Sequence, residues 1–405
     1  MKRTHYCNDV RAPLVGRRVT LCGWVNRRRD HGGVIFVDLR DRSGLVQVVF
    51  SPEQQTHSHQ QAHTLRNEFV VRVSGTVIPR SPETRNDKLP TGMIEVQVEQ
   101  LEILNAAGTL PFQLDDESVG EGVRLTHRFL DLRRPEMQRN FLVRHKTLQS
   151  LRRALDEAGF LELETPMLTR STPEGARDYL VPSRVNPGQF YALPQSPQLF
   201  KQLLMIAGFD RYSQITRCFR DEDLRADRQP EFTQVDLEMS FVEPDDVMGI
   251  VETIVARLFR EVLDVGLEPP FARLTYAEAM DRYGLDAPDV RIRMVLTDIT
   301  AIMRETGFQV FAQTARQTGR RGMQGAVKVL KVPGGAAMTR KEIDECTEFV
   351  AIYGAKGLAW IKINGPWREE GWQSPIVKFF SEEEKDALQE ATGAQTGDLL
   401  FFGAD

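Results

Sequence analysis

The sequence of 405 residues predicts an α+β protein with about two or three domains, the first of which is a small five-stranded β-barrel. Three observations lead to this prediction. Short strand-like runs separated by Gly and Pro occupy residues 1–108. Two strands joined by a charged loop, near residues 212–239, indicate an antiparallel sheet. From about residue 286 strand and helix signals alternate, which predicts a further α+β domain.

Composition and charge indicate a soluble globular protein. Hydrophobic residues make up 41% of the chain and charged residues 27%, and no apolar run approaches the length of a membrane span. The N-terminal segment Met1–Cys7 is polar, so we expect no secretory signal. The four cysteines lie far apart without a Cys-x-x-Cys pair, which disfavours a zinc site and predicts a cytoplasmic location.

The first module has the pattern of a nucleic-acid-binding barrel. Its expected strands are Arg18–Asn26, Val34–Arg40, Leu45–Phe50, Glu68–Ile78 and Ile94–Leu104. Residues 1–50 hold ten Lys/Arg against four Asp/Glu, a local charge of +6 in a chain whose net charge is −5. The densest point, Arg27–Arg29, is expected in a loop between the first two strands. A five-stranded barrel with a basic loop is typical of the OB-fold.

Strand alternation selects candidate nucleic-acid contacts on this barrel. Ile35 and Val37 face the interior, which turns Phe36 outward, and Val46 in the next strand turns Gln47 outward. An exposed ring beside an amide and arginines suits a stacked base that is read along its edge. A single exposed Phe is also common on ordinary surfaces, so a plain barrel surface stays an alternative.

Three histidines follow the third expected strand. His59 and His63 have the i, i+4 spacing that can chelate a metal on a helix. A pair lacks the further ligands that a metal site needs, and the neighbours, His57 included, are polar. We therefore expect a solvated helix face here.

The most informative stretch is residues 212–239. The strand Tyr212–Phe219 delivers Arg220 at its end, and a charged link closes at Pro230. In the second strand the two-residue period places Thr233 and Leu237 on a core-facing side. The other side carries Phe232, Gln234, Asp236 and Glu238. Because carboxylates are costly to bury without partners, this face predicts a site for an anionic, base-bearing ligand. An ordinary hairpin with a solvated charged turn is the alternative.

Helix and loop signals precede this motif. A helix whose apolar stripe is Phe141, Leu148, Leu151 and Leu155 closes at Gly159, and a strand is expected at Phe160–Glu164. The polar segment Ser171–Asp178 is typical of a lid loop. A helix beginning near Pro197 places Gln198 and Lys201 on one face. A lysine there suits a carboxylate partner better than an amide.

These residues carry a resemblance to class II aminoacyl-tRNA synthetases. The run Phe219–Gln234 resembles the second signature motif in the form found in bacterial aspartyl enzymes. The helix and strand before Pro166 resemble the first motif, which builds a homodimer interface, and Gly23–Asp30 resembles the anticodon-binding stretch. The resemblance covers essentially the whole chain. It implies an OB-fold anticodon-binding domain at 1–108, a hinge at 109–140, an antiparallel-sheet catalytic domain at 141–285 and a bacterial α+β insertion domain of the GAD type at 286–405.

The resemblance implies aspartate–tRNA ligation, in which ATP activates L-aspartate and the aspartyl-adenylate is transferred to tRNA(Asp). Arg220 would be the catalytic residue, and Mg²⁺ would share the triphosphate charge, with unknown ligands. The implied aspartate-binding residues are Glu174, Gln198, Leu199, Phe200, Lys201, Arg220 and Asp236. The implied ATP-binding residues are Arg220, Asp221, Glu222, Arg228, Gln229 and Phe232. The implied anticodon contacts are Arg29, His31, Phe36, Gln47 and Glu95. His31 and Thr84 mark whether tRNA(Asn) is also charged, and His is frequent at the first position in members that charge both.

The chain departs from the family after the insertion domain, which closes with Phe402–Asp405. There the family resumes its catalytic domain with acidic metal ligands and a third motif, and none of these has a candidate here. We therefore expect a C-terminally truncated enzyme, impaired in catalysis and unstable, with exposed sheet edges. The alternatives are an asparagine or lysine enzyme, which Lys201 disfavours, and a non-catalytic fragment or paralogue that binds the tRNA anticodon.

Overall fold

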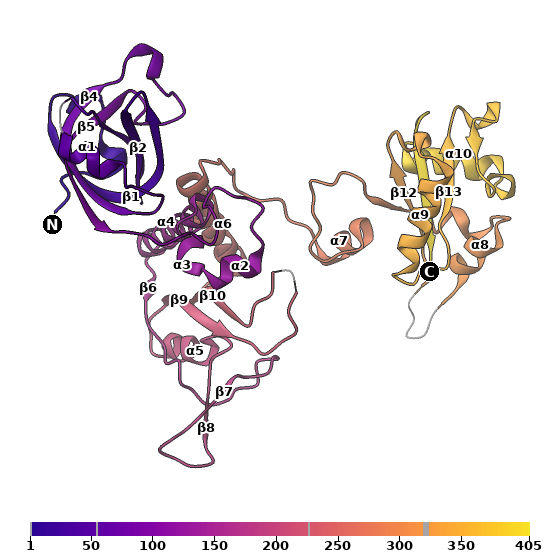
Figure 1. Cartoon of the computed structure of the whole chain (residues 1–405). Coiled ribbons are helices and arrows are strands. Elements are labelled where there is room, and N and C mark those ends of the chain that lie inside the picture. The colour runs from indigo at the N-terminus through magenta and orange to yellow at the C-terminus, as the bar shows by residue number, and fades with distance from the viewer. Residues whose placement is uncertain (1, 54–55, 226, 319–323) are drawn as a thin grey trace. The chain divides into compact units, whose positions relative to one another are not determined.

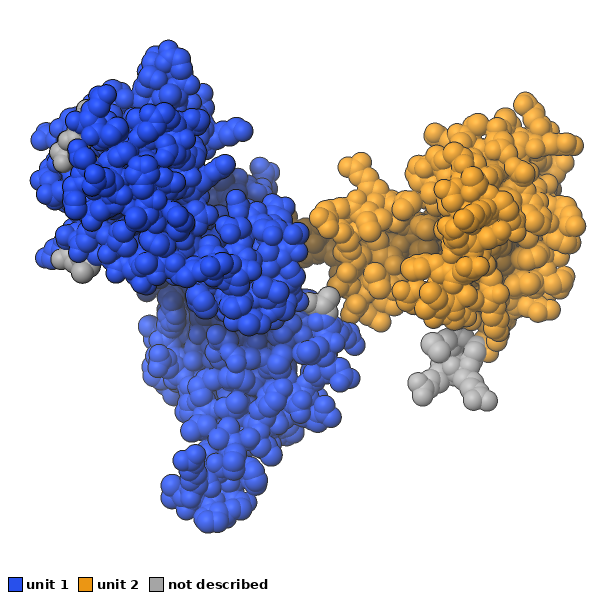
Figure 2. Space-filling view, in the orientation of Figure 1, with its two compact units in different colours: residues 1–269 blue, residues 270–405 orange. Residues whose placement is uncertain are grey.

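The chain divides into two compact units, residues 1–269 and 270–405 (Figure 2). The computed structural model describes residues 2–53, 56–225, 227–318 and 324–405. Within these ranges no helix combines the length and apolarity needed to cross a bilayer. The second unit begins at Pro270, whereas the sequence pattern predicts a domain that begins at residue 286.

The first unit opens with the closed five-stranded barrel that the sequence predicts (Figure 1). Its strands are β1 (Arg18–His31), β2 (Val34–Asp41), β3 (Gly44–Phe50), β4 (Val70–Pro79) and β5 (Ile94–Asn105), and helix α1 (Thr56–Ala62) lies between β3 and β4 in the chain. The order around the barrel is β1-β2-β3-β5-β4, with β3 and β5 parallel and the other described pairs antiparallel. The OB-type barrel is thereby confirmed.

The barrel core follows from period-two alternation in its strands. Leu21, Ile35, Leu39, Val46 and Val73 are almost completely buried. The structure corrects one expectation about the basic residues. Arg27–Arg29 do not lie in a loop, because they belong to β1, which continues to His31. The pairing of Arg27–His31 with β2 extends the hairpin, so the three arginines occupy fixed strand positions.

The segment predicted to be a hinge follows the barrel and contains the short helices α2 (Glu121–Thr126) and α3 (Arg128–Asp131). Asp131 is fully buried and forms ion pairs with Arg128 and, at 3.6 Å, with Arg124. Because two arginines of the same segment converge on one carboxylate, the two short helices are held against each other.

A three-stranded sheet follows, in the order β10-β9-β6. Its elements are α4 (Pro135–Glu157), β6 (Leu161–Glu162), the hairpin β7 (Leu180–Pro182) and β8 (Phe190–Ala192), α5 (Gln198–Ile206), β9 (Arg211–Phe219), β10 (Glu231–Met239) and α6 (Pro244–Leu263). Helices α4 and α6 pack on one face of the sheet through Leu151, Leu155, Ile254, Leu237 and Met239. The core-facing side of β10 is therefore the predicted one.

Two details of this region differ from the expectation. The expected strand Phe160–Glu164 is reduced to the two residues of β6. The expected apolar stripe on α4 is only half covered, because Leu151 and Leu155 are buried while Phe141 is 56% exposed. Helical periodicity identifies an apolar face, but it does not tell which part of that face another element covers.

The second unit is built on a five-stranded sheet in the order β11-β12-β15-β13-β14. Its elements are α7 (Tyr276–Tyr283), β11 (Leu296–Asp298), α8 (Gln309–Arg316), β12 (Val327–Val332), α9 (Arg340–Ala351), β13 (Ala359–Ile363), β14 (Trp372–Gln373), α10 (Glu382–Thr392) and β15 (Leu399–Ala404). The expected strand Val327–Val332 coincides with β12. The expected helix Met338–Tyr353 is α9, which begins after Thr339 because that side chain accepts a hydrogen bond from the Glu342 amide.

Candidate functional site

The first site lies on the face of the β9–β10 pair opposite helices α4 and α6. Its centre is Lys201, from α5, whose Nζ lies 3.0 Å from Asp236 Oδ1 and 3.2 Å from Glu238 Oε2. Lys201 and Asp236 are buried, and burial raises the pKa of Asp236 while Lys201 opposes that rise. Asp236 Oδ2 is buried and has no hydrogen-bond partner among the described residues. A buried, unpartnered oxygen beside an ion pair is suited to receive a donor from a ligand.

The polar segment Ser171–Asp178 is tied to this face by hydrogen bonds. Ser196 Oγ donates to Glu174 Oε2 at 2.7 Å, which brings Glu174 to the start of α5. Gln195, almost fully buried, receives a bond from the Ala176 amide and donates to the Ala176 carbonyl. The segment also forms a bridge from Arg177 to Asp221, just beyond the end of β9, where a lid is expected.

The residues expected to bind ATP gather where β9 meets β10. The Arg220 amide donates to the Pro230 carbonyl at 2.9 Å, which closes the charged link. The Arg220 guanidinium lies 5.1 Å from the centre of the Phe232 ring. Across the link, Arg228 pairs with Glu222 at 3.0 Å. Two contacting pairs, Arg220 with Phe232 and Arg228 with Glu222, therefore belong to the strand ends and the link between them.

Other predicted residues are placed less centrally. Leu199 is 51% exposed, and Gln229 is exposed on the link between β9 and β10. Asp221 lies under the lid segment, where its amide donates to the Arg177 carbonyl at 3.0 Å. Gln198 and Phe200 are half-buried on α5, beside Lys201 in sequence.

The family resemblance implies no role for two residues that contact this cluster. Glu238 is a second partner of Lys201, and Gln234 Nε2 donates to Asp236 Oδ1 at 3.4 Å. Their signal is present in the sequence, because both lie on the polar face of β10 at the two-residue period. Ser196 is also omitted, since a hydroxyl between a loop and a helix start has no distinctive spacing.

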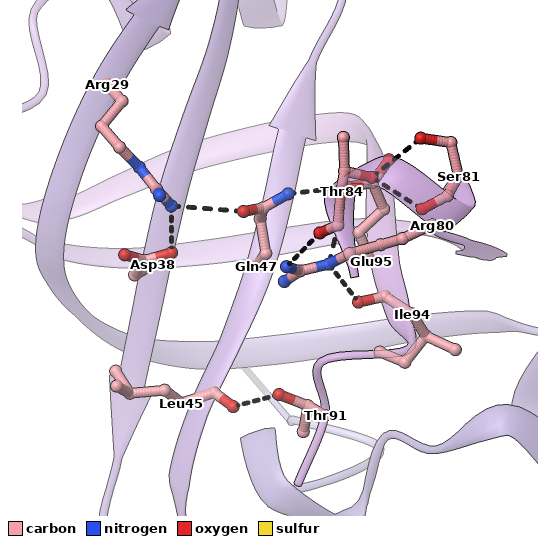
Figure 3. Close-up of polar contacts among 10 residues, drawn as sticks. All are labelled: Arg29, Asp38, Leu45, Gln47, Arg80, Ser81, Thr84, Thr91, Ile94 and Glu95. Carbon is pink, nitrogen blue, oxygen red and sulfur yellow. Dashed lines mark hydrogen bonds and ion pairs between the residues drawn. The ribbon is translucent and has the colours of Figure 1, made fainter. Parts of the chain in front are cut away.

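The second site lies on the barrel, where a row of polar side chains crosses β1, β2, β3 and β5 (Figure 3). Arg29 Nη2 donates to Asp38 Oδ1 at 2.5 Å and to Gln47 Oε1 at 3.2 Å. Gln47 Nε2 in turn donates to Glu95 Oε2 at 2.7 Å. Gln47 points out of the core as expected, but these partners bury it. The structure thereby brings three of the predicted anticodon contacts into one network.

Arg80 extends this network to the turn that carries Thr84 (Figure 3). Its Nε donates to the Ile94 carbonyl at 3.0 Å, and its Nη1 donates to the Thr84 carbonyl at 3.4 Å. The Arg80 Nε also lies 3.9 Å from Glu95, and burial lowers the pKa of Arg80. The sequence prediction omits Arg80, since a lone arginine after a strand resembles any surface cation.

The remaining predicted contacts flank the network. Phe36 is half-buried and pairs across the hairpin with Arg29, while His31 is exposed at the turn between β1 and β2. The expectation of a solvated helix face at the histidines is wrong for His59, which is buried. Its Nε2 lies 2.6 Å from the Gly33 carbonyl, so α1 holds the turn beside His31.

This plan, an OB-type barrel before a sheet whose antiparallel strands β9 and β10 hold Arg220 and Phe232 near their adjoining ends, is that of the class II aminoacyl-tRNA synthetases. The chain belongs to their aspartate, lysine and asparagine group, because the family model for class II tRNA synthetases (D, K and N) matches residues 120–401. A second model, the OB-fold nucleic acid binding domain, matches residues 19–104.

Curated relatives narrow the comparison. Over all of its 405 residues, the chain is 69% identical to an aspartate–tRNA(Asp/Asn) ligase of Magnetococcus marinus. The aligned region is 67% of that relative. It is 58% identical to the ligase of the same name from Desulfosudis oleivorans, of which it covers 66%. The chain thus spans about two thirds of the length of these relatives.

Two solved structures show a similar fold. An aspartyl-tRNA synthetase structure from Leishmania major is 25% identical, with a TM-score of 0.58 over 65% of this chain and 53% of that one. An asparaginyl-tRNA synthetase from Pyrococcus horikoshii, complexed with asparaginyl-adenylate, is 20% identical with a TM-score of 0.63. The alignment covers 100% of this chain and 93% of that one.

Proposed function

We propose that this protein activates L-aspartate with ATP and transfers it to tRNA(Asp). The observation that carries the proposal is the buried Lys201–Asp236 pair with its unpartnered Asp236 Oδ2. A substrate carboxylate is attracted to the Lys201 ammonium, and a substrate ammonium supplies the donor that Oδ2 lacks. Glu174, held by Ser196 on the lid segment, is the second anion for that ammonium.

Lysine in this position favours aspartate over asparagine. A carboxylate gains a charge-assisted hydrogen bond from an ammonium, whereas an amide gains a weaker neutral one. The ammonium is already shared by Asp236 and Glu238, so these two carboxylates also balance the charge of Lys201 when no substrate is bound. The site therefore discriminates by charge as well as by shape.

Adenylate formation needs placement and charge, not a protein nucleophile. An aspartate carboxylate oxygen attacks the α-phosphorus of ATP, the bond to the bridging oxygen breaks, and pyrophosphate leaves. Arg220 faces the charge that develops on the α-phosphate. Phe232 offers its ring to the adenine, and Glu222 accepts from the adenine amino group. A ribose hydroxyl of the tRNA then attacks the activated carbonyl, and AMP leaves.

Magnesium is expected from the charge of the triphosphate, and the described residues do not offer it a ready site. No three His, Cys, Asp or Glu side chains gather in the described ranges where an ion could be held.

Recognition of tRNA is proposed for the barrel network. Arg29, Gln47 and Glu95 present donors and acceptors beside the half-buried ring of Phe36, which suits unstacked anticodon bases. The two curated relatives have Asp/Asn in their names, and His31 is exposed at the turn next to this network. We propose that the protein charges tRNA(Asn) as well as tRNA(Asp). We also propose that Thr84, in the turn that Arg80 holds, contributes to this choice of tRNA.

A homodimer in the cytoplasm is the proposed setting. Apolar side chains on α4 and β6 are exposed, among them Phe141 at 56%, Leu142 at 53% and Leu161 at 50%. Such side chains on adjoining elements favour burial against a second copy. All four cysteines are free thiols, which supports a reducing compartment.

Aspartate-dependent ATP–pyrophosphate exchange tests the activation step. We expect the exchange activity of the native chain, which the sequence predicts to be impaired, to be abolished in Lys201→Met, because the substrate carboxylate loses its ammonium. Lys341→Met, which changes a lysine that is 86% exposed on its side chain, serves as the matched control. Exchange that survives in Lys201→Met contradicts the proposed substrate site. Absence of exchange in the native chain, with binding of the tRNA anticodon retained, supports the non-catalytic alternative.

A further inference from the structure

Glu68 has a backbone conformation that its side chain does not favour. Its φ is +66°, in the left-handed region that few residues other than glycine adopt. Of the described non-glycine residues with positive φ, the other four are exposed, whereas Glu68 is only 4% exposed. A strained residue persists only where its surroundings hold it, and such residues concentrate at functional positions.

Two arginines hold the Glu68 carboxylate. Arg40 Nη2 donates to Glu68 Oε1 at 2.7 Å and to Oε2 at 2.8 Å, and Arg133 Nη1 donates to Oε2 at 2.7 Å. Arg40 is buried and also donates to Asn26 Oδ1 at 2.7 Å. The Arg133 guanidinium lies 5.2 Å from the centre of a Trp24 ring. We call Glu68, Arg40 and Arg133 the Glu68 cluster.

The Glu68 cluster joins the barrel to the hinge. Arg40 lies on β2 and Glu68 precedes β4, whereas Arg133 lies between α3 and α4. A cavity of about 940 Å³ adjoins the cluster, lined on the barrel side by Arg27 and Arg42 and on the α4 side by Leu142 and Lys146. Because this part of the boundary is hollow, a buried carboxylate between two cations is well suited to fix the barrel on the hinge.

Helix α4 continues the connection to the proposed catalytic face. It begins two residues after Arg133, and its Arg144 donates to Thr233 Oγ1 on β10 at 2.6 Å. Strand β10 carries Asp236, the partner of Lys201. A continuous series of contacts thus runs from the barrel through Glu68 and Arg133 to the strand of the substrate site.

We propose that Glu68 is a positioning residue that sets the barrel relative to the catalytic face, so that one tRNA engages both. This inference rests on the proposed function for its ligand. Two sites on one rigid body bind one long ligand more tightly than two sites on loosely joined bodies, because the second contact then forms at a high effective concentration. Without the Glu68 carboxylate, Arg40 and Arg133 face each other as like charges and the barrel is released.

Binding of two RNA probes distinguishes positioning from a direct contact. One probe is a full tRNA(Asp) transcript, and the other is its isolated anticodon stem–loop, which reaches only the barrel. We expect Glu68→Gln and Arg133→Gln each to weaken binding of the full transcript by about tenfold and to leave stem–loop binding within about twofold. The double variant should be no weaker than either single variant, and Arg133→Lys should restore most of the affinity.

The control is Glu102→Gln, which removes an exposed ion pair with Arg72, at 2.5 Å on the same barrel. It should leave both probes unaffected. Loss of full-transcript binding in Arg133→Gln but not in Glu68→Gln would mean that Arg133 touches the RNA itself, and would overturn the proposal. Equal weakening of both probes would show damage to the barrel and would overturn it as well.

A measurement without RNA separates this inference from the proposed function. In the native chain Arg133 is engaged by Glu68 and Trp24, so we expect the hinge to resist trypsin. Tryptic cleavage between residues 124 and 134 should be several times faster in Glu68→Gln than in Glu102→Gln. Equal cleavage rates would overturn the positioning role whether or not tRNA binds.

Discussion

The ammonium of Lys201 lies 3.0 Å from the carboxylate of Asp236, and both residues are more than nine-tenths buried. Burial removes most of the water from both charges, and this desolvation offsets their mutual attraction. A buried ion pair is therefore stabilised by the hydrogen bonds of neighbouring groups as well as by its own attraction. Lys201 keeps Glu238 as a second partner at 3.2 Å, while Asp236 keeps one oxygen free of donors from the described residues. The Lys201 ammonium thus has two carboxylate partners, whereas Asp236 Oδ2 can still accept a hydrogen bond.

We predict that Asp236→Asn lowers the free energy of unfolding of the first unit by about 1–3 kcal/mol, because a buried charge loses its nearest partner. Glu238 remains near Lys201, which keeps the loss below that of a fully isolated charge. Urea unfolding measures this difference. Glu231→Gln on the same strand removes the exposed pair with Arg217 and should cost less than about 1 kcal/mol. Equal costs for the two variants would contradict the role of burial.

We predict a pH-dependent contribution from Glu261 on α6, which receives hydrogen bonds from Arg257 and Arg153. Hydrogen bonds, that from Arg257 first, lower the pKa of Glu261 from 4.5 to about 2. A lowered carboxyl pKa stabilises the folded state above pH 4.5, and that stabilisation is lost as the pH falls from 4.5 toward 2. The Tm difference between native and Glu261→Gln chains should therefore narrow over this range. A Tm difference independent of pH would contradict the assignment.

We predict that His59→Ala loosens the turn that carries His31, since the ring Nε2 lies 2.6 Å from the Gly33 carbonyl. Loss of this hydrogen bond should lower barrel stability by about 1 kcal/mol. Fluorescence anisotropy should also show weaker binding of the tRNA(Asp) and tRNA(Asn) anticodon stem–loops. His57→Ala, which changes an exposed residue of the same helix, is the control. An unchanged affinity in His59→Ala would separate α1 from RNA binding.

We predict that Gly75→Ala destabilises the barrel by about 1–3 kcal/mol, because a side chain there overpacks the β4–β5 bulge. A Cβ at this position would lie 2.1 Å from the Gln97 carbonyl oxygen, so the strands would have to move apart. At Gly108 a Cβ would meet no atom within 4 Å, and Gly108→Ala should be neutral or slightly stabilising. Thermal unfolding of both variants checks the contrast.

Strand alternation in the sequence predicts the polar and apolar sides of β2, β3 and β10, because side-chain direction has a period of two whatever the strand packs against. It thereby selects Phe36, Gln47 and Asp236 from their spacing alone. It cannot show that Gln47 becomes buried, since that depends on Arg29 and Glu95 arriving from other strands.

Contacts between distant segments account for what the sequence does not reveal. The family resemblance implies that Lys201 and Asp236 both bind aspartate, but it does not indicate that they contact each other. The structure shows the two side chains paired with each other, because α5 packs on β10. Arg80 and Glu68 give no local signal at all. Their importance comes from carbonyls and guanidinium groups that lie far away in the sequence.

The order of strands in the second unit has a consequence for how that unit opens. Strand β15 is hydrogen-bonded to β12 on one side and to β13 on the other, and it brings Leu400 and Phe402 into the same core as Val329 and Ile361. If β15 detaches, both halves of the sheet lose their shared neighbour at once. Amide hydrogens on β12 and β13 should therefore exchange with solvent with one common free energy of opening, as members of a single cooperative opening event.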